Sequence, residues 1–164
     1  MKKVIISLVV AIAAITSTTV YAYSNGLVKT NEKELFNIHY KNVNTSSENG
    51  KVYLEGNNDI YFECDLKQPG DTFEFTVDMV NDSNKKAKVD EKYITELTDK
   101  QQRYLKYTVT YADGTEIKKD DILNSNETKT LKVKVEFLFD ITEEDLPTEK
   151  ENLDLSFNIT MIEA

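Results

Sequence analysis

Few side chains in this sequence have the types and the spacing that catalysis needs. His39 is the sole histidine. A Ser-His-acid set needs a histidine to carry the proton, and no motif surrounds His39, so we interpret it as a structural or surface residue. A zinc site needs several Cys or His ligands at short spacing, and the sequence has no His-Glu-x-x-His motif. We therefore expect a protein that is not an enzyme and that holds no cofactor.

Calcium is the metal whose ligands are most abundant in the chain, because hard cations bind carboxylate oxygens. The densest groups are Asp120 with Asp121, and the set Asp140, Glu143, Glu144 and Asp145. Neither group follows the ligand order of an EF-hand, and neither has the glycine for its sharp turn. We interpret both as solvated acidic loops and expect no metal site, with calcium binding as the alternative.

Cys64 is the sole cysteine, so no internal disulfide can form and stability must come from packing. Because no basic residue flanks it, we interpret Cys64 as a small apolar residue buried on a strand, in preference to a reactive thiol.

The elements that position these side chains are strands, because a period of two dominates the pattern of apolar residues after residue 34. Four segments show it most sharply, and their inward sets are Phe73, Phe75, Val77 and Met79; Leu105, Tyr107, Val109 and Tyr111; Leu131, Val133, Val135, Phe137 and Phe139; and Leu153, Leu155, Phe157, Ile159 and Met161. Weaker strands are expected over residues 35–42, 51–55 and 59–65. The pattern predicts an all-β fold, an antiparallel β-sandwich of the jelly-roll or immunoglobulin-like type.

Two short helices and one tight hairpin complete this expectation. Charged and apolar residues mix at helical spacing before Arg103, which predicts a helix over residues 98–103. A second helical turn is expected over residues 142–146, capped by Thr142 and ended by Pro147. Asp113-Gly114 predicts a hairpin with a type I′ turn, in which both central residues have positive φ.

The N-terminus has the order of an export signal. Lys2 and Lys3 precede an apolar run over residues 4–15, and small residues follow. Val20 and Ala22 occupy the positions that a signal peptidase reads, so cleavage after Ala22 is expected. A retained membrane anchor is the alternative. The chain then divides into a signal peptide that forms a helix (1–22), a polar arm (23–34) and one β-sandwich domain (35–164).

The charge of the mature chain argues against nucleic acid as a partner. Loss of Lys2 and Lys3 takes the 20 basic residues to 18 against 29 acidic residues, a net charge of −11. Affinity for DNA or RNA comes from Lys and Arg that neutralise phosphates, so an acidic surface repels both. We expect contact with the membrane only through the signal segment before cleavage.

Three segments together resemble the TasA/camelysin family of secreted Gram-positive surface and biofilm-matrix proteins. They are Val20-Tyr21-Ala22-Tyr23-Ser24-Asn25, the turn Leu66-Lys67-Gln68-Pro69-Gly70-Asp71, and Leu153-Asp154-Leu155-Ser156-Phe157-Asn158-Ile159. In that family a Leu-Lys-Pro-Gly-Asp turn opens a strand that leads to an Asn-rich turn, and Asn81-Asp82-Ser83-Asn84 follows here in the same order. Gln68 is an insertion relative to the family turn, and the chain is shorter than the fibre-forming members.

The resemblance implies a jelly-roll-like sandwich that polymerises when the N-terminal segment of one subunit adds as a strand to the next. The assembly arm would be Tyr23, Ser24, Asn25, Gly26, Leu27 and Val28, within residues 23–34. The alternative for this stretch is a disordered terminus without a role in assembly. We therefore expect a secreted structural protein of the cell surface or biofilm matrix that binds itself or other matrix and surface proteins. The alternatives are a monomeric surface adhesin or ligand-binding module and, third, a camelysin-like metalloprotease, which the lack of a zinc motif disfavours.

Overall fold

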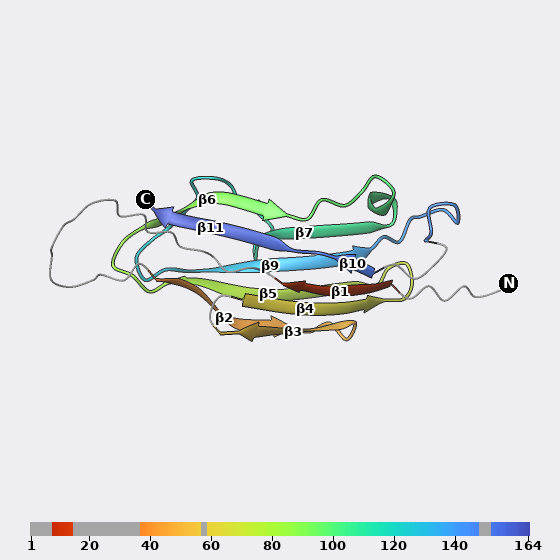
Figure 1. The fold of residues 1–164 in the computed structure, drawn as a ribbon, viewed down its shortest axis with the longest axis horizontal. Helices are drawn as coiled ribbons and strands as arrows, with labels where there is room; N and C mark the ends of the chain where they lie inside the picture. The colour runs from red at the N-terminus through yellow and green to blue at the C-terminus, as the bar shows by residue number, and fades with distance from the viewer. Residues whose placement is uncertain (1–7, 15–36, 57–58, 148–151) are drawn as a thin grey trace.

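The computed structural model describes residues 8–14, 37–56, 59–147 and 152–164, and in these ranges the regular structure is almost entirely β (Figure 1). The strands are β1 (Leu8–Ala14), β2 (Ile38–Thr45), β3 (Gly50–Glu55), β4 (Asp59–Leu66), β5 (Thr72–Asn81), β6 (Ala87–Ile94), β7 (Leu105–Tyr111), β8 (Ile122–Leu123), β9 (Thr128–Phe137), β10 (Asn152–Asp154) and β11 (Phe157–Glu163). The all-β fold class is confirmed.

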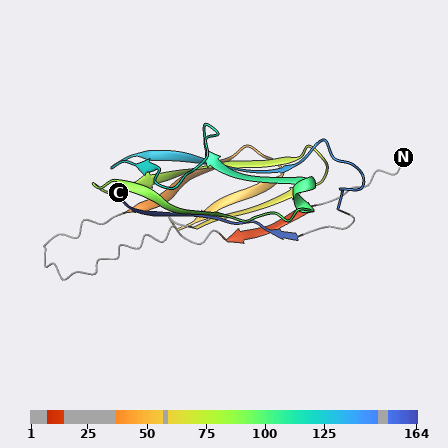
Figure 2. The same cartoon turned by 90° about the horizontal axis from the view of Figure 1, so that it is seen from above.

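The strands form three hydrogen-bonded sheets, in the orders β10-β1-β4-β3, β11-β6-β8 and β2-β5-β9-β7. All of these strand pairs are antiparallel except β1 with β10, which are parallel. Only Leu155 and Ser156 separate β10 from β11, so the first two sheets follow one another along the chain. Figure 2 shows β7 and β9 on one side of the molecule, with β1 and β10 on the other.

Most of the alternating residues that the sequence singles out are buried in the core. Every member of the set on β5 is buried, as are Leu131, Val133, Val135 and Phe137 of β9 and all five residues of the C-terminal set. Tyr107 and Tyr111 of β7 are only partly buried. Phe139 is 76% exposed, because β9 ends at Phe137 and the chain turns away. Alternation therefore identifies the buried faces correctly while the strand lasts.

An aromatic cluster joins the strands on the two sides of the core. Phe62 of β4 lies 5.3 Å from Phe75 and 6.1 Å from Phe73 between ring centroids, and both partners lie on β5. Gly50 of β3 packs so closely that a Cβ there would lie 2.7 Å from the Phe73 ring and 2.3 Å from the carbonyl oxygen of Glu63. These contacts hold β3 and β4 against β5 without any contribution from β1.

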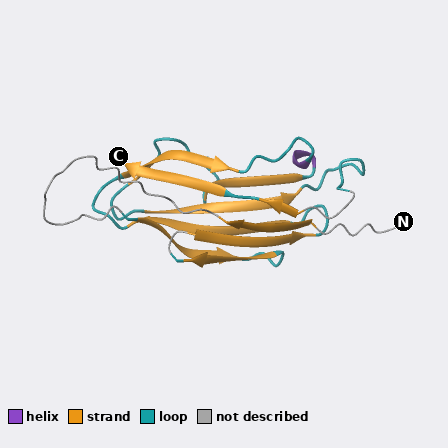
Figure 3. Cartoon of the chain, in the orientation of Figure 1, coloured by secondary structure: helices purple, strands orange, loops and turns teal. Residues whose placement is uncertain are grey.

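In the part of the chain that the structure describes, the helical structure is one short element (Figure 3). The helix expected over residues 98–103 is a single 3₁₀ turn, Gln101–Arg103, and residues 142–146 form a turn in place of a helix. In that turn the backbone amide of Asp145 donates to the Thr142 carbonyl, and the Thr142 hydroxyl donates to the Asp145 carboxylate. Side-chain bonding of this kind competes with helix formation, so the expected second helix does not form.

Within residues 1–22, where a signal helix is expected, the structure describes only residues 8–14. Leu8–Ala14 is extended and forms strand β1, hydrogen-bonded to β4 on one side and to β10 on the other. Its sequence, LVVAIAA, includes Val9, Val10 and Ile12, and β-branched residues of this kind favour strands. Away from a membrane, an apolar segment is stabilised by pairing with strands that would otherwise have free edges.

One of the two turns described next agrees with the prediction from its residues, and the other differs from it. Gly70 has φ +93°, and the Asp71 carboxylate accepts hydrogen bonds from the amides of Lys67 and Gln68, which fixes the turn between β4 and β5. The prediction of a type I′ turn at Asp113-Gly114 is wrong. Of these two residues, Gly114 alone has a positive φ. The Gly114 amide donates to the Tyr111 carbonyl, as in a three-residue hairpin loop that ends on a left-handed glycine.

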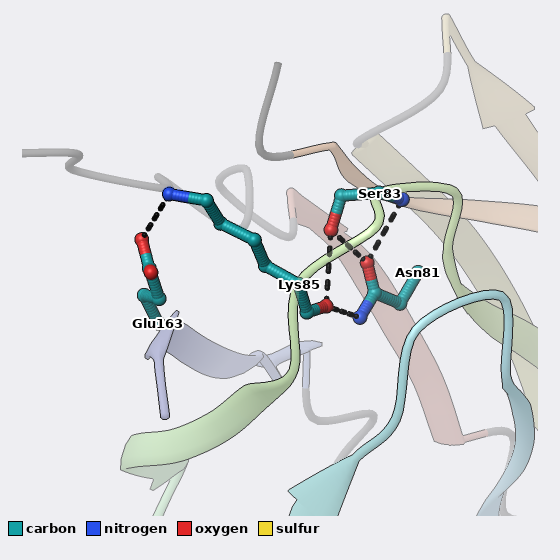
Figure 4. A network of polar contacts seen from close by, with 4 residues as sticks. All are labelled: Asn81, Ser83, Lys85 and Glu163. Atoms are coloured by element: carbon teal, nitrogen blue, oxygen red, sulfur yellow. Dashed lines mark hydrogen bonds and ion pairs between the residues drawn. The ribbon is translucent and has the colours of Figure 1, made fainter. Parts of the chain in front are cut away.

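A buried polar network fixes the turn that follows β5 (Figure 4). The Asn81 side-chain amide donates to the carbonyl oxygens of Lys85, Leu123 and Asn124 at 2.7, 3.2 and 3.0 Å. Its oxygen accepts from the backbone amide and the hydroxyl of Ser83 at 3.0 and 2.5 Å. One side chain therefore connects the turn after β5 to the loop after β8.

Replacing Asn81 with alanine is expected to lower the free energy of unfolding by about 2 kcal/mol, because buried donors and acceptors lose their partners. Urea titration measures the change. Asn44→Ala is the matched control, since the Asn44 amide makes one exposed hydrogen bond to the Asn42 carbonyl, and its cost should stay under about 0.5 kcal/mol. Equal effects of the two substitutions would contradict the role given to the Asn81 network.

Candidate assembly site

The candidate site is the position that β1 occupies between β4 and β10, which we call the acceptor slot (Figure 1). β1 runs antiparallel to β4, with Leu8 opposite Leu66 and Ala14 opposite Tyr61. It runs parallel to β10, with Val10 opposite Leu153. Neighbouring strands lie about 4.8 Å apart, so β4 and β10 stand about 10 Å from each other with one strand between them.

The two strands that flank the acceptor slot, β4 and β10, form its walls, and the side of each wall that faces the core is apolar. On β4 the residues of this side are Ile60, Phe62, Cys64 and Leu66, and on β10 the residue is Leu153; all are buried. β3 pairs with the other edge of β4 along its whole length, from Gly50 opposite Cys64 to Glu55 opposite Asp59. The edge of β4 that faces β1 is thus the one left for a further strand.

Cys64 lies on the β4 wall of the acceptor slot, opposite Val10 of β1. The side chain is 2% exposed, which confirms the expectation of a buried residue on a strand. Burial raises the pKa of the Cys64 thiol to about 12, and the neighbouring Asp65 carboxylate adds to the shift. Since the thiolate is the reactive form, the thiol is inert at neutral pH while the slot is filled.

The folded full-length chain is expected to react with maleimide at Cys64 far more slowly than an unfolded chain. With a pKa near 12, the thiolate fraction at pH 8 falls by on the order of 10³ relative to an ordinary cysteine. The rate should rise with pH through pH 10, where a free cysteine has already reached its plateau. Because the chain has no other cysteine, the measurement reports on this position alone. A rate equal to that of the denatured protein would contradict the buried position.

The predicted assembly arm lies outside the described residues. Tyr23, Ser24, Asn25, Gly26, Leu27 and Val28 all fall in the range 15–36, so the structure does not test their role. The described residues instead show the pairing of β1 with β4 and β10, which the sequence did not reveal. Clustered aromatic and β-branched residues predicted a strand over residues 59–65, but this composition does not say which strands pair with its two edges.

His39 lies on β2 with its Nε2 atom 3.5 Å from the Asp82 carboxylate. This contact joins the first strand after the arm to the turn after β5. The pair gives His39 a structural partner, in line with its interpretation as a structural residue.

The acidic loops use their carboxylates in contacts within the chain. Asp120 lies 3.2 Å from the Lys88 ammonium group, and Asp121 accepts a hydrogen bond of 3.0 Å from the Tyr111 hydroxyl. Within residues 8–14, 37–56, 59–147 and 152–164, no three His, Cys, Asp or Glu side chains group as ligands of a metal ion.

Asp145 belongs to the second acidic set and also has protein partners. Its carboxylate accepts from the Thr142 hydroxyl at 2.8 Å and from the Arg103 guanidinium at 3.2 Å. These two contacts, with the Thr142 bond the larger cause, lower the pKa of Asp145. The interaction ties the 3₁₀ turn to the loop that follows β9.

A second feature is an open groove of about 710 Å³ between the end of β6 and the start of β7. Apolar side chains of Ile94, Leu97 and Leu138 line it, together with Tyr107. The Tyr107 hydroxyl is buried and has no hydrogen-bond partner among the described residues, and burial raises its pKa. The groove has the size of a small-molecule site.

Comparison of the chain with models of protein families, with curated proteins and with solved structures found no match. Among the residues that the structure describes, no helix is long and apolar enough to cross a membrane. The resemblance to the TasA/camelysin family therefore stays a prediction from its three sequence segments.

Proposed function

We propose that this chain is a secreted structural protein of the cell surface or extracellular matrix that self-associates by strand addition. The observation that carries the proposal is the origin of β1. Leu8–Ala14 fills the acceptor slot, yet it lies wholly within residues 1–22, the expected signal peptide. After cleavage at Ala22, β4 and β10 would each present an unpaired edge, and unpaired edges are templates for a strand of another chain.

The fold that we propose for this function is a jelly-roll-like sandwich. It is supported by the order of the strands, in which β10 continues through Leu155 and Ser156 into β11, so that one sheet would run from β3 to β8 when the slot is filled. The sheet β2-β5-β9-β7 would be the second layer. In this arrangement an empty slot interrupts a layer in its interior, which is costlier than an exposed outer edge because backbone groups of two strands lose partners.

The proposed donor is the arm at residues 23–34 of a second copy. Its first six residues, Tyr23, Ser24, Asn25, Gly26, Leu27 and Val28, nearly match the seven residues of β1 in length. Residues 29–37 then connect the donor to β2, which begins at Ile38, and nine extended residues span about 30 Å. The arm is long enough to leave its own domain and enter a neighbour. Other matrix or surface proteins that offer an extended strand would fit the same slot.

Imaging and sedimentation of the mature chain, residues 23–164, test this proposal. We expect filaments whose mass grows with protein concentration, since each subunit has one donor and one acceptor and head-to-tail contacts do not close. The full-length chain at the same concentration serves as the comparison. A mature chain that remains monomeric at millimolar concentration would overturn the proposal.

A monomeric ligand-binding module is the second candidate, favoured by the groove at Ile94, Leu97, Tyr107 and Leu138. The groove is lined by these apolar side chains together with polar ones, among them Gln102 and Lys106, a mixture that suits a small molecule with hydrogen-bonding groups. The monomeric outcome of the sedimentation experiment would favour this candidate.

A further inference from the structure

We propose that β1 is an autoinhibitory strand, which caps the acceptor slot of its own chain until the leader has been cut and has left. The inference rests on the proposed function and adds its regulation. The strand that fills the slot, Leu8–Ala14, precedes the cleavage position expected after Ala22. The arm expected to replace it, residues 23–34, follows that position.

The pairing of β1 blocks both edges of the acceptor slot. On the β4 side, its partners run from Leu66 to Tyr61. On the β10 side, its partners are all three residues of that strand, Asn152, Leu153 and Asp154. A donor strand from a second copy needs the same backbone amides and carbonyls, so the two strands cannot occupy the slot together.

Covalent attachment decides the competition between them. A strand in the same chain as its binding site can be present there at an effective concentration in the millimolar range. Subunits at about 10 μM offer their donor arms at a concentration roughly 100-fold lower, so at similar intrinsic affinity the leader strand wins by about that factor. Cleavage turns the leader into a separate peptide and removes this advantage.

The ladder between β1 and β4 also has an interruption that favours release. The register shifts between Val10 and Ala13, so the strand is not paired evenly along its length. A bulge of this kind leaves backbone groups unpaired and weakens the ladder locally. The local interruption makes β1 easier to displace once it is no longer joined to the domain.

The position of Cys64 allows the cut and the departure of the leader to be separated. Val10 is the residue directly opposite Cys64 in the antiparallel pair, and Cα atoms of such pairs lie about 4.5–5.5 Å apart, within the range that a disulfide spans. Val10→Cys in the full-length chain should therefore form a disulfide with Cys64. Val9→Cys is the matched control, because Val9 lies one position away, opposite Asp65.

The experiment uses the full-length chain with a site for a specific protease inserted between Ala22 and Tyr23. Four states are compared by sedimentation and electron microscopy: uncut; cut; cut with the Val10→Cys disulfide oxidised; and the last of these after reduction. We expect filaments from the cut and the reduced states, and at least a 10-fold higher critical concentration for the uncut and the oxidised states. The Val9→Cys protein should assemble once cut, whatever the oxidant.

Each outcome separates the inference from the proposed function. If the uncut or the oxidised protein assembles as readily as the cut protein, autoinhibition by β1 is wrong while assembly itself stands. If no state assembles and the cut protein keeps β1 bound, or unfolds when β1 leaves, β1 is a permanent part of the fold, and both the inference and the proposed function fail.

Discussion

Removal of residues 23–34 from the mature chain is expected to abolish filament formation without unfolding the domain. The remaining chain, residues 35–164, keeps the acceptor slot but has no donor strand to give to a neighbour. Burial of Leu27 and Val28 alone would contribute about 1.5–3 kcal/mol each, and ladder hydrogen bonds add to this. The critical concentration should therefore rise by at least 100-fold, which sedimentation measures.

Add-back of the arm as a peptide distinguishes a lost donor from a damaged domain. A synthetic peptide of residues 23–34 should bind the truncated protein and slow maleimide labelling of Cys64, because it refills the slot beside that residue. The same peptide with Leu27→Asp and Val28→Asp should not protect Cys64, whereas a control peptide with Asn31→Asp should. If residues 35–164 form filaments in unchanged yield, the arm is not the donor strand.

Replacing Phe62 with alanine is expected to lower the free energy of unfolding by about 3–5 kcal/mol, the largest loss of stability that we predict for a single substitution. The Phe62 side chain is fully buried and lies against Phe73 and Phe75 of β5. Its removal leaves a cavity at the contact that holds the slot wall to the rest of the core. Urea unfolding of the full-length chain, followed by circular dichroism, measures the change.

Phe139→Ala is the matched control for this substitution. The same side chain is removed from a position that is 76% exposed, so the free energy of unfolding should change by less than about 0.5 kcal/mol. Equal losses at Phe62 and Phe139 would contradict the assignment of the core.

The buried faces could be predicted because the strands bury one side each. The inward residues of β5 and β11, such as Phe75 and Ile159, follow a strict period of two and are buried. β6 was missed for the opposite reason. It buries only Ala87 and Val89, and charged residues occupy most of its remaining positions, so no apolar alternation reveals it.

The acceptor slot could not be predicted, because alternation gives the buried face of a strand and says nothing about its neighbours. Val10 and Cys64 lie more than fifty positions apart in the sequence, and their pairing depends on the order of strands in the sheet. The composition of residues 4–15 indicates an export signal and equally suits a buried strand, since both require apolar residues. The pairing of Leu8–Ala14 with β4 and β10 is what indicates the strand.

The measurement that tests the central claim most directly is a reconstruction of filaments of the mature chain by electron cryomicroscopy. We predict a strand between β4 and β10 whose density continues into residues 23–34 of the adjacent subunit. Filaments in which β4 pairs directly with β10, or in which the slot holds the subunit's own arm, would contradict the claim.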